Sequence, residues 1–173
     1  MLRVDKIAFR RMADITAGNL ITYDRSSVSM LGLRVDHPPQ DGIGSAFPAA
    51  GILRQPLPGD RFLPLIDRTA LNARCLDWGA PPEVRLDPAS IVTRRAQLTT
   101  PTAGFLIVVE DHVAIATYPT GGFGDRLFWD LRTGEYVDPG ARDFCVVTGW
   151  ALGSADGDGR FLPLLTYPND YKG

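Results

Sequence analysis

The second half of the chain alternates between short apolar runs and turn-forming residues, and this pattern predicts strands. The runs are rich in β-branched and aromatic residues, and most of the segments between them contain glycine. The runs assigned to strands are 105–109, 113–118, 127–131, 135–137, 144–152 and 161–167. Consecutive short strands joined by turns are typical of an antiparallel β-meander, which we therefore expect from about residue 104 to residue 168.

Helical spacing of apolar residues occurs in the first half, beside residues that begin and end helices. Asp5 and Gly18 bracket the first such segment, and Asp87-Pro88 opens the last, because Asp caps well and Pro is tolerated in the first turn. The helices are predicted at 5–17, about 67–79 and 87 to about 98, with two strands, 20–23 and 28–35, between the first two. The sequence therefore predicts the α+β class: a single globular domain over residues 1–173, with two or three short helices in its N-terminal half.

A long loop is predicted from Asp36 to Pro58. This stretch contains His37-Pro38-Pro39 and Asp41-Gly42, and both combinations favour turns. Loops of this length inside a compact domain are often functional or face a partner. We therefore predict a contact surface in the 36–58 loop, with His37 and Phe47 among its binding residues.

Large aromatic residues gather on the late strands, among them Phe128, Trp129 and Trp150. Because side chains alternate between the faces of a strand, Phe128 and Trp129 are expected on opposite faces of one sheet. One face is then covered by the helices, and the other by a loop or a partner. We assign Trp129 and Trp150 to this binding surface. The leading interpretation is a non-catalytic binding or assembly protein that uses the 36–58 loop and the aromatic sheet face to hold a protein partner or a second copy of itself.

Composition narrows the class of protein without naming an activity. The 173 residues are 45% hydrophobic and 22% charged with a formal net charge of −2, so they can bury a core but offer no basic surface for nucleic acid. No apolar run approaches the ~18 residues of a membrane span, and the first residues do not resemble an export signal. Two cysteines make no disulfide framework. We therefore expect no nucleic-acid or membrane partner and a cytoplasmic location.

Motifs for cofactors and metals do not occur in the sequence. The segment 120–125 is rich in glycine, but it joins two predicted strands instead of opening a helix, so it fits neither a P-loop nor a dinucleotide fingerprint. His37 and His112 are far apart along the chain, and there is no pair of cysteines at metal-binding spacing. We therefore expect no cofactor and no bound metal.

The chain order Cys75, His112, Asp130 resembles that of papain-like hydrolases, including transglutaminase-like enzymes. The segment Glu110–Ile115 is similar to their histidine strands, because His112 begins an apolar run. The resemblance implies a nucleophilic Cys75, with His112 as its base and Asp130 as the group that orients the base. In those families the cysteine opens a helix, which lowers its pKa, whereas Cys75 falls near the end of the predicted helix 67–79. A cysteine hydrolase is thus one alternative, and a small-molecule receptor is another.

One pentapeptide occurs twice: Arg61–Leu65 and Arg160–Leu164 both read Arg-Phe-Leu-Pro-Leu. Each copy follows an Asp/Gly turn, but the flanking residues do not repeat. Because proline cannot donate to a strand ladder, both copies are predicted to be edge strands. A duplicated half-domain and a shared local structure remain alternative explanations of the repeat.

Overall fold

The computed structural model describes residues 7–25, 27–39, 45–54, 64–68, 72–94, 101–119, 125–140, 142–156 and 158–169. Within these ranges the protein is almost entirely antiparallel β structure, and no helix reaches 7 residues. The named helical elements are two 3-10 turns, η2 (Met12–Asp14) and η4 (Pro88–Ser90). The predicted α+β class is therefore wrong, while the prediction of antiparallel sheet is confirmed. In the part of the chain that the structure describes, no helix is long and apolar enough to cross a membrane.

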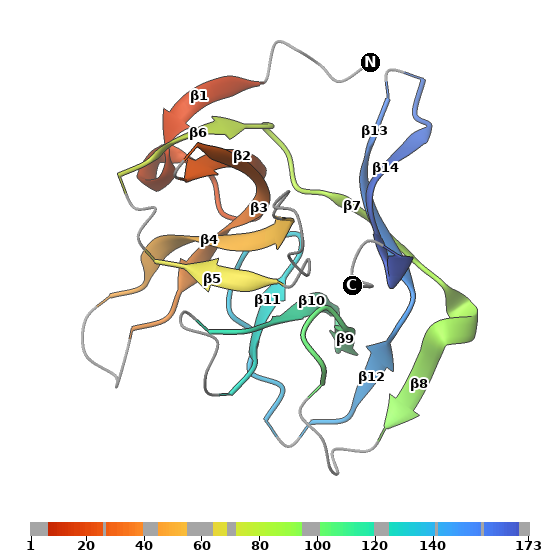
Figure 1. Cartoon of the computed structure of the whole chain (residues 1–173). Helices are drawn as coiled ribbons and strands as arrows, with labels where there is room; N and C mark the ends of the chain where they lie inside the picture. The colour runs from red at the N-terminus through yellow and green to blue at the C-terminus, as the bar shows by residue number, and fades with distance from the viewer. Residues whose placement is uncertain are drawn as a thin grey trace.

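The described strands form three sheets (Figure 1). The six-stranded sheet has the order β1-β6-β2-β3-β4-β5, with bounds β1 Ala8–Arg11, β2 Leu20–Arg25, β3 Val28–His37, β4 Phe47–Arg54, β5 Leu65–Asp67 and β6 Arg74–Asp77. The five-stranded sheet has the order β11-β10-β9-β12-β8, with bounds β8 Ile91–Arg94, β9 Leu106–Val109, β10 His112–Thr117, β11 Leu127–Asp130 and β12 Phe144–Val147. The three-stranded sheet has the order β14-β13-β7, with bounds β7 Glu83–Leu86, β13 Trp150–Ala155 and β14 Phe161–Tyr167.

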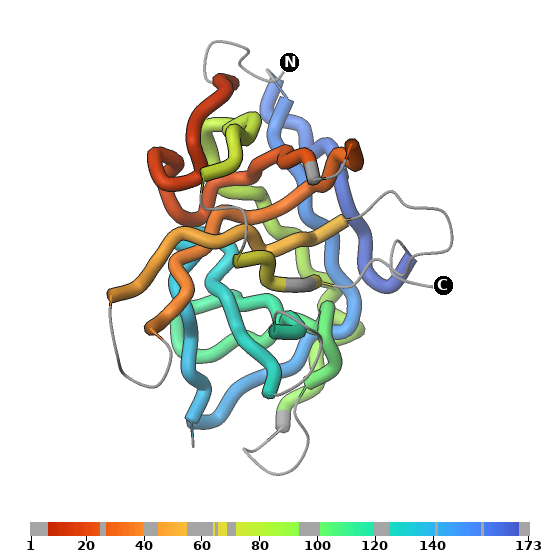
Figure 2. The backbone as a smooth tube through the Cα atoms, turned by 60° about the vertical axis from the view of Figure 1, so that its left-hand side comes forward, coloured from red at the N-terminus to blue at the C-terminus, as the bar shows by residue number. Residues whose placement is uncertain are grey.

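A bent ribbon joins the five-stranded and three-stranded sheets. Residues 83–94 supply β7 and β8, and residues 144–155 supply β12 and β13, so each segment contributes one strand to each sheet. The two segments pair antiparallel in both sheets, and in Figures 1 and 2 the 144–155 segment runs from the bottom of the molecule to the top. At the bend, the amide of Asp87 donates to the carbonyl of Gly149 at 2.9 Å. The pairing is therefore continuous through the change of sheet.

One apolar core contains side chains from all three sheets. Along β9, Leu106 and Val108 contact this core, while Ile107 and Val109 belong to a second cluster on the opposite face of the same sheet. A strand that is covered on both faces has no polar side to show, which explains the uninterrupted apolar runs in the sequence. The residues of the shared core are Leu20, Leu33, Val35, Ala49, Leu53, Ile66, Leu106, Ile115, Trp129, Leu131, Val147, Trp150, Leu152 and Leu165.

The three predicted helices are replaced by strands and 3-10 turns. Within 5–17, Ala8–Arg11 pairs with β6, and only η2 is helical. Met12 and Ile15, the residues with helical spacing, instead pack on the outer face of the six-stranded sheet. The helical spacing of Met12 and Ile15 therefore reflects two side chains that cover one face of a sheet, and not a helix.

The other two predicted helices are also absent among the described residues, each for a different reason. Within 67–79, Arg74–Asp77 is an internal strand between β1 and β2, so its backbone groups pair with neighbouring strands. In the last segment, the Oδ1 atom of Asp87 accepts from the amide of Ala89 at 3.0 Å, so the predicted cap exists but opens only η4. The residues that follow, Ile91–Arg94, are largely β-branched and form β8.

The two strands predicted early in the chain are confirmed as β2 and β3, but the long loop and the meander are wrong in part. Phe47–Arg54 is strand β4, with β3 and β5 on either side, while residues 40–44 and 55–58 lie outside the described residues. Four of the late strands form where they were expected, as β9, β10, β11 and β14, but the predicted strand 135–137 shows only isolated bridges at Glu135 and Tyr136. The predicted strand 144–152 is divided into β12, which inserts beside β9, and β13, which lies with β14 in a different sheet. Side chains of β4 therefore enter the core instead of forming a contact loop.

The second Arg-Phe-Leu-Pro-Leu copy contributes to β14, which lies at the edge of its sheet as predicted. Pro163 sits within this strand, opposite Gly153. In the first copy, residues 61–63 lie outside the described residues. Its last residue, Leu65, begins β5, which also lies at the edge of its sheet.

Two glycine turns bring the backbones of the six-stranded and five-stranded sheets into contact. Gly18 precedes β2 and Gly134 follows β11, with φ angles of 89° and 68°. A Cβ atom on Gly134 would lie 2.4 Å from the amide nitrogen of Gly18 and 2.4 Å from the carbonyl oxygen of Arg34. The amide of Asp36 donates to the carbonyl of Gly134 at 2.9 Å. No side chain fits between these backbones, so glycine is required by both conformation and space.

We predict that Gly134→Ala destabilises the protein by about 3 kcal/mol or more, because it combines a left-handed backbone with a backbone clash. Gly159→Ala is the matched control: its φ is 77°, but nothing lies within 4 Å of the added Cβ atom. The control is expected to lose only about 1–2 kcal/mol. Denaturant unfolding of both variants provides the comparison, and equal losses would contradict the role of the close contact.

Candidate functional site

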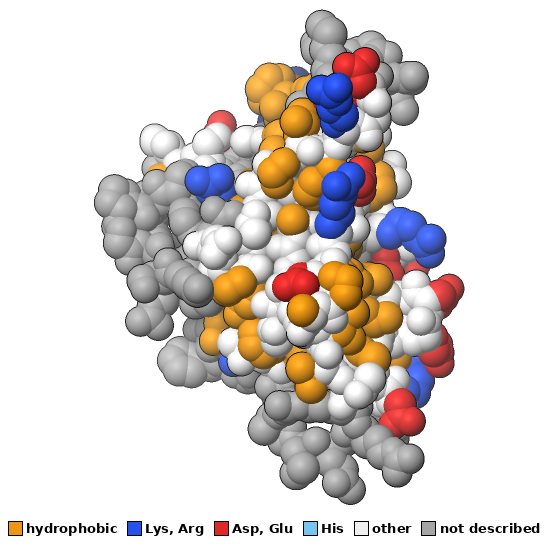
Figure 3. All heavy atoms as spheres, turned by 90° about the vertical axis from the view of Figure 1, so that its right-hand side faces the viewer, with side chains coloured by type: hydrophobic (Ala, Val, Ile, Leu, Met, Phe, Trp, Pro, Cys, Tyr) orange, Lys and Arg blue, Asp and Glu red, His pale blue; other side chains and the backbone are white. Residues whose placement is uncertain are grey.

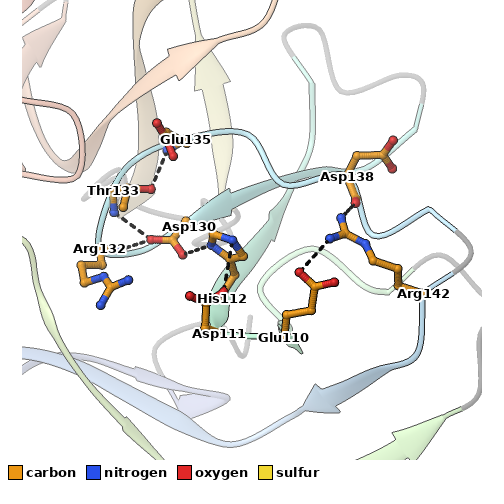
Figure 4. A network of polar contacts seen from close by, with 9 residues as sticks. All are labelled: Glu110, Asp111, His112, Asp130, Arg132, Thr133, Glu135, Asp138 and Arg142. Carbon is orange, nitrogen blue, oxygen red and sulfur yellow. Dashed lines mark hydrogen bonds and ion pairs between the residues drawn. The ribbon is translucent and has the colours of Figure 1, made fainter.

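A histidine–carboxylate pair lies where β10 and β11 run side by side (Figure 4). The Nδ1 atom of His112 is 2.9 Å from Oδ2 of Asp130. Asp130 is buried, whereas the imidazole of His112 keeps 33% of its surface exposed. An ionised carboxylate only accepts hydrogen bonds, so Nδ1 carries the proton. The other ring nitrogen, Nε2, is 3.5 Å from Oδ1 of the exposed Asp111.

The Asp130 carboxylate also organises the turn that follows β11. Its Oδ1 atom accepts from the amide of Arg132 at 2.8 Å and from the amide of Thr133 at 2.7 Å. Burial raises the pKa of Asp130, but these two amides, His112 and the Thr133 side chain together outweigh it and lower the pKa below its usual value. Asp130 therefore stays ionised and holds the turn that carries Gly134.

A second polar network lies beside this pair, on the surface (Figure 4). Nη1 of Arg142 is 3.2 Å from Oε2 of Glu110, and Nη2 of Arg142 donates to the carbonyl of Asp138. Both ends of the Arg142–Glu110 pair are largely exposed, so it contributes little to stability. These residues pair with each other and leave His112 and Asp130 as a separate unit.

Cys75 lies apart from the His112–Asp130 pair. It is on β6 of the six-stranded sheet, in a cluster with Met12, Tyr23 and other residues that contains neither His112 nor Asp130. Burial, together with the charge of Asp24, raises the pKa of the Cys75 thiol to about 11. A thiol that stays protonated and buried is no nucleophile. The structure thus brings together two members of the predicted triad and leaves out the third.

The described residues offer His112 no other reactive partner. Its side-chain partners are the carboxylates of Asp111 and Asp130, and neither can act as the thiol or hydroxyl nucleophile that the predicted hydrolase requires. Among the side chains that the structure describes, no group of three or more His, Cys, Asp or Glu residues is placed to hold a metal ion. The pair is therefore best explained as support for the turn after β11.

Three of the four predicted binding residues meet inside the molecule. The ring of His37 stacks on Phe47 at 4.9 Å with an interplanar angle of 15°, and it lies 5.6 Å from the ring of Trp129. His37 and Trp129 are buried, so the predicted aromatic contact face is core at this point. Trp150 lies elsewhere: it stacks on Tyr167 at 5.6 Å and donates from Nε1 to the carbonyl of Gly104 at 2.8 Å.

Arg68 is the residue of this cluster that sequence analysis missed. Its Nη2 atom is 2.9 Å from Nε2 of His37, and its guanidinium lies 5.8 Å from the centre of the Phe47 ring. Arg68 directly follows the short strand β5, and 31 positions separate it from His37. No local motif relates residues at that separation, so the contact was visible only after β3, β4 and β5 were paired.

In comparisons with known proteins, no family model, curated protein or solved structure matches the chain.

We predict that iodoacetamide does not label Cys75 in the native protein, because its thiol is buried with a pKa near 11. Cys145, which is partly exposed, is expected to react first, and Cys75 only on unfolding. Peptide mapping by mass spectrometry across pH measures both rates. His112→Ala should leave the Cys75 rate unchanged. Native labelling of Cys75 with an apparent pKa below ~8.5, slowed by His112→Ala, would restore the hydrolase alternative.

We predict that Asp130→Ala destabilises the protein by about 3 kcal/mol, because two backbone amides and His112 lose a buried acceptor. Asp138→Ala is the matched control, since Oδ1 of Asp138 caps the amide of Gly140 at 2.9 Å in an exposed turn. Its expected loss is below about 1 kcal/mol. Urea titrations of the two variants test the difference, and a loss in Asp130→Ala no larger than in the control would refute the supporting role.

Proposed function

We propose that this chain is a non-catalytic assembly protein that joins a second copy of itself through the edge strand β8. The single observation that carries the proposal is the exposure of Ile91 and Val92. Their exposed fractions are 40% and 44%, and because they are consecutive on a strand they point to opposite faces. An edge strand with apolar side chains exposed on both faces is a ready template for another strand.

Other sheet edges in the described part of the chain are better protected than β8, whose charged residue, Arg94, stands at its end. The outer side of β11 is covered, because the amide of Val137 donates to Phe128 at 2.9 Å. The outer side of β5 is covered likewise, because the amide of Ile66 donates to the carbonyl of Tyr118 at 3.2 Å. The remaining edges carry the residues that disfavour strand addition, which are Pro163 in β14, Glu83 and Arg85 in β7, and Arg10 and Arg11 in β1.

Figure 3 shows the side of the molecule that carries β7 and β8. Hydrophobic side chains cover much of the lower half of this view, and charged side chains gather along its right margin. An apolar area with a charged margin is the usual composition of a protein contact surface.

A second copy is the occupant that the geometry of β8 favours. Antiparallel pairing of β8 with itself is compatible with a two-fold axis, so the same strand serves both subunits and the interface closes. With Val92 opposite the partner's Val92, each Ile91 stands opposite a Thr93, so β-branched residues face each other along the pair. Such pairing would join the two five-stranded sheets into one continuous sheet.

An assembly role was also expected from the sequence, but the proposed contact surface is strand β8 instead of the 36–58 loop and the aromatic sheet face. The aromatic residues that were assigned to the contact are largely in the core, and much of the expected loop is strand β4. A catalytic role has weaker support, because the His112–Asp130 pair has no thiol beside it among the described residues.

We predict that the protein self-associates in a concentration-dependent way and that Val92→Lys weakens the association at least about tenfold, which corresponds to about 1.4 kcal/mol. Phe9→Lys is the matched control, because Phe9 is 65% exposed on the edge strand β1 and its replacement adds the same charge. Sedimentation equilibrium and light scattering measure both variants, and thermal unfolding confirms that they fold. A protein that remains monomeric at all accessible concentrations, or a control that dissociates as readily as Val92→Lys, would overturn the proposal.

A further inference from the structure

The hydrogen bonds of His37 define its protonation state. Its Nδ1 atom is 2.7 Å from the carbonyl of Pro38, and a carbonyl only accepts, so Nδ1 carries a proton. Its Nε2 atom is 2.9 Å from Nη2 of Arg68, and a guanidinium only donates, so Nε2 carries none. His37 is therefore neutral, in the form protonated at Nδ1.

This contact is buried and has no internal substitute. His37 is 3% exposed, between the rings of Phe47 and Trp129. The buried Nε atom of Arg68 has no hydrogen-bond partner among the described residues. Nε2 of His37 is therefore the one acceptor that these residues show for the Arg68 guanidinium. Removing that acceptor would leave a largely buried cation with still fewer partners.

The charged groups around His37 leave protonation uncompensated. Arg68 faces the ring from the segment after β5. Asp36 precedes it on β3, but its carboxylate pairs with Arg34. Asp130 neighbours Trp129 on β11, but its carboxylate pairs with His112. Among the described residues, no carboxylate thus contacts the imidazole of His37. A protonated, positively charged His37 would therefore face the positive charge of Arg68.

We propose that His37 and Arg68 form an acid-sensitive latch that holds the short strand β5 at the edge of the six-stranded sheet. Protonation of Nε2 turns the acceptor into a donor and places a cation against a cation, so the contact between His37 and Arg68 breaks. Arg68 directly follows Asp67, the last residue of β5, and this strand is only 3 residues long. Loss of the contact weakens the attachment of β5, which then rests on its pairing with β4 and on the hydrogen bonds of Ile66 with Tyr118 and of Asp67 with Tyr23.

The sign of the pH dependence follows from the environment of the ring. Burial lowers the pKa of His37 first of all, and the charge of Arg68 lowers it further, although the hydrogen bond to Pro38 opposes them. A lowered pKa means that the unfolded chain binds the proton more readily than the folded one. The latch is therefore fully closed above the usual histidine pKa of about 6.5 and opens as the pH falls below it.

Two histidines in the whole chain make the latch directly observable by NMR. The nitrogen shifts of the imidazoles report the protonated nitrogen, and His112→Gln assigns the signals. We expect His37 in the form protonated at Nδ1 near pH 8, with a titration midpoint below about 6.5. In Arg68→Met the midpoint should rise, because the facing cation is gone. A His37 protonated at Nε2, or a midpoint that Arg68→Met leaves unchanged, would overturn the latch.

Opening is measured by amide hydrogen exchange at β5. After correction for the intrinsic pH dependence, exchange at residues 65–67 should accelerate at least about tenfold between pH 8 and pH 5, the range in which histidine changes charge. His37→Gln retains an acceptor for Arg68 but does not titrate, so its exchange ratio should be flat over this range. His112→Gln is the control and should keep the acceleration. Exchange in His37→Gln that accelerates as much as in the wild type would refute the proposal independently of the NMR result.

Discussion

The contact between the turns at Gly18 and Gly134 is the constraint on which the arrangement of the sheets depends. These two turns belong to different sheets, and their backbones meet without room for a Cβ atom. The contact continues into strand-like hydrogen bonds, because Asp36 donates to Gly134 and Gly18 donates to Arg34. A joint built from backbone has a defined geometry, since it tolerates no repacking of side chains. The shared apolar core can then be packed against sheets whose relative position is already determined.

Two polar side chains, His112 and Asp130, support this joint. Asp130 holds the turn of Gly134 with its carboxylate, and His112 partners the remaining oxygen of that carboxylate. A buried charge is tolerated only when its hydrogen bonds are satisfied, and three donors satisfy this one. The same pair of residue types orients a base in many enzymes, but here the side chain that would need the base lies in another cluster. The predicted hydrolase would need a nucleophile, a base and an orienting carboxylate close together, whereas support of the turn needs only Asp130 and its partner His112.

The proposed assembly role rests on where apolar side chains remain exposed. Three of the residues that the sequence assigned to the contact, His37, Phe47 and Trp129, contact one another inside the molecule. The proposed contact uses smaller, β-branched residues on β8, of which Ile91 and Val92 are exposed. Residue size therefore misleads as a guide to interfaces, because the largest apolar side chains gain most from burial inside the fold. Position at an unprotected edge is the better guide.

Most of the antiparallel strands after about residue 104, the early strands β2 and β3, and the placement of His112 and Asp130 on successive strands could be predicted from the sequence alone. These features are local: alternation, β-branched runs and neighbouring strands decide them within a few residues. Only the tertiary structure decided that Ala8–Arg11 and Arg74–Asp77 pair as strands, that β4 enters the core, and that Arg68 meets His37. The physical reason is that these choices depend on partners far along the chain, where long-range pairing and burial outweigh weak helical spacing.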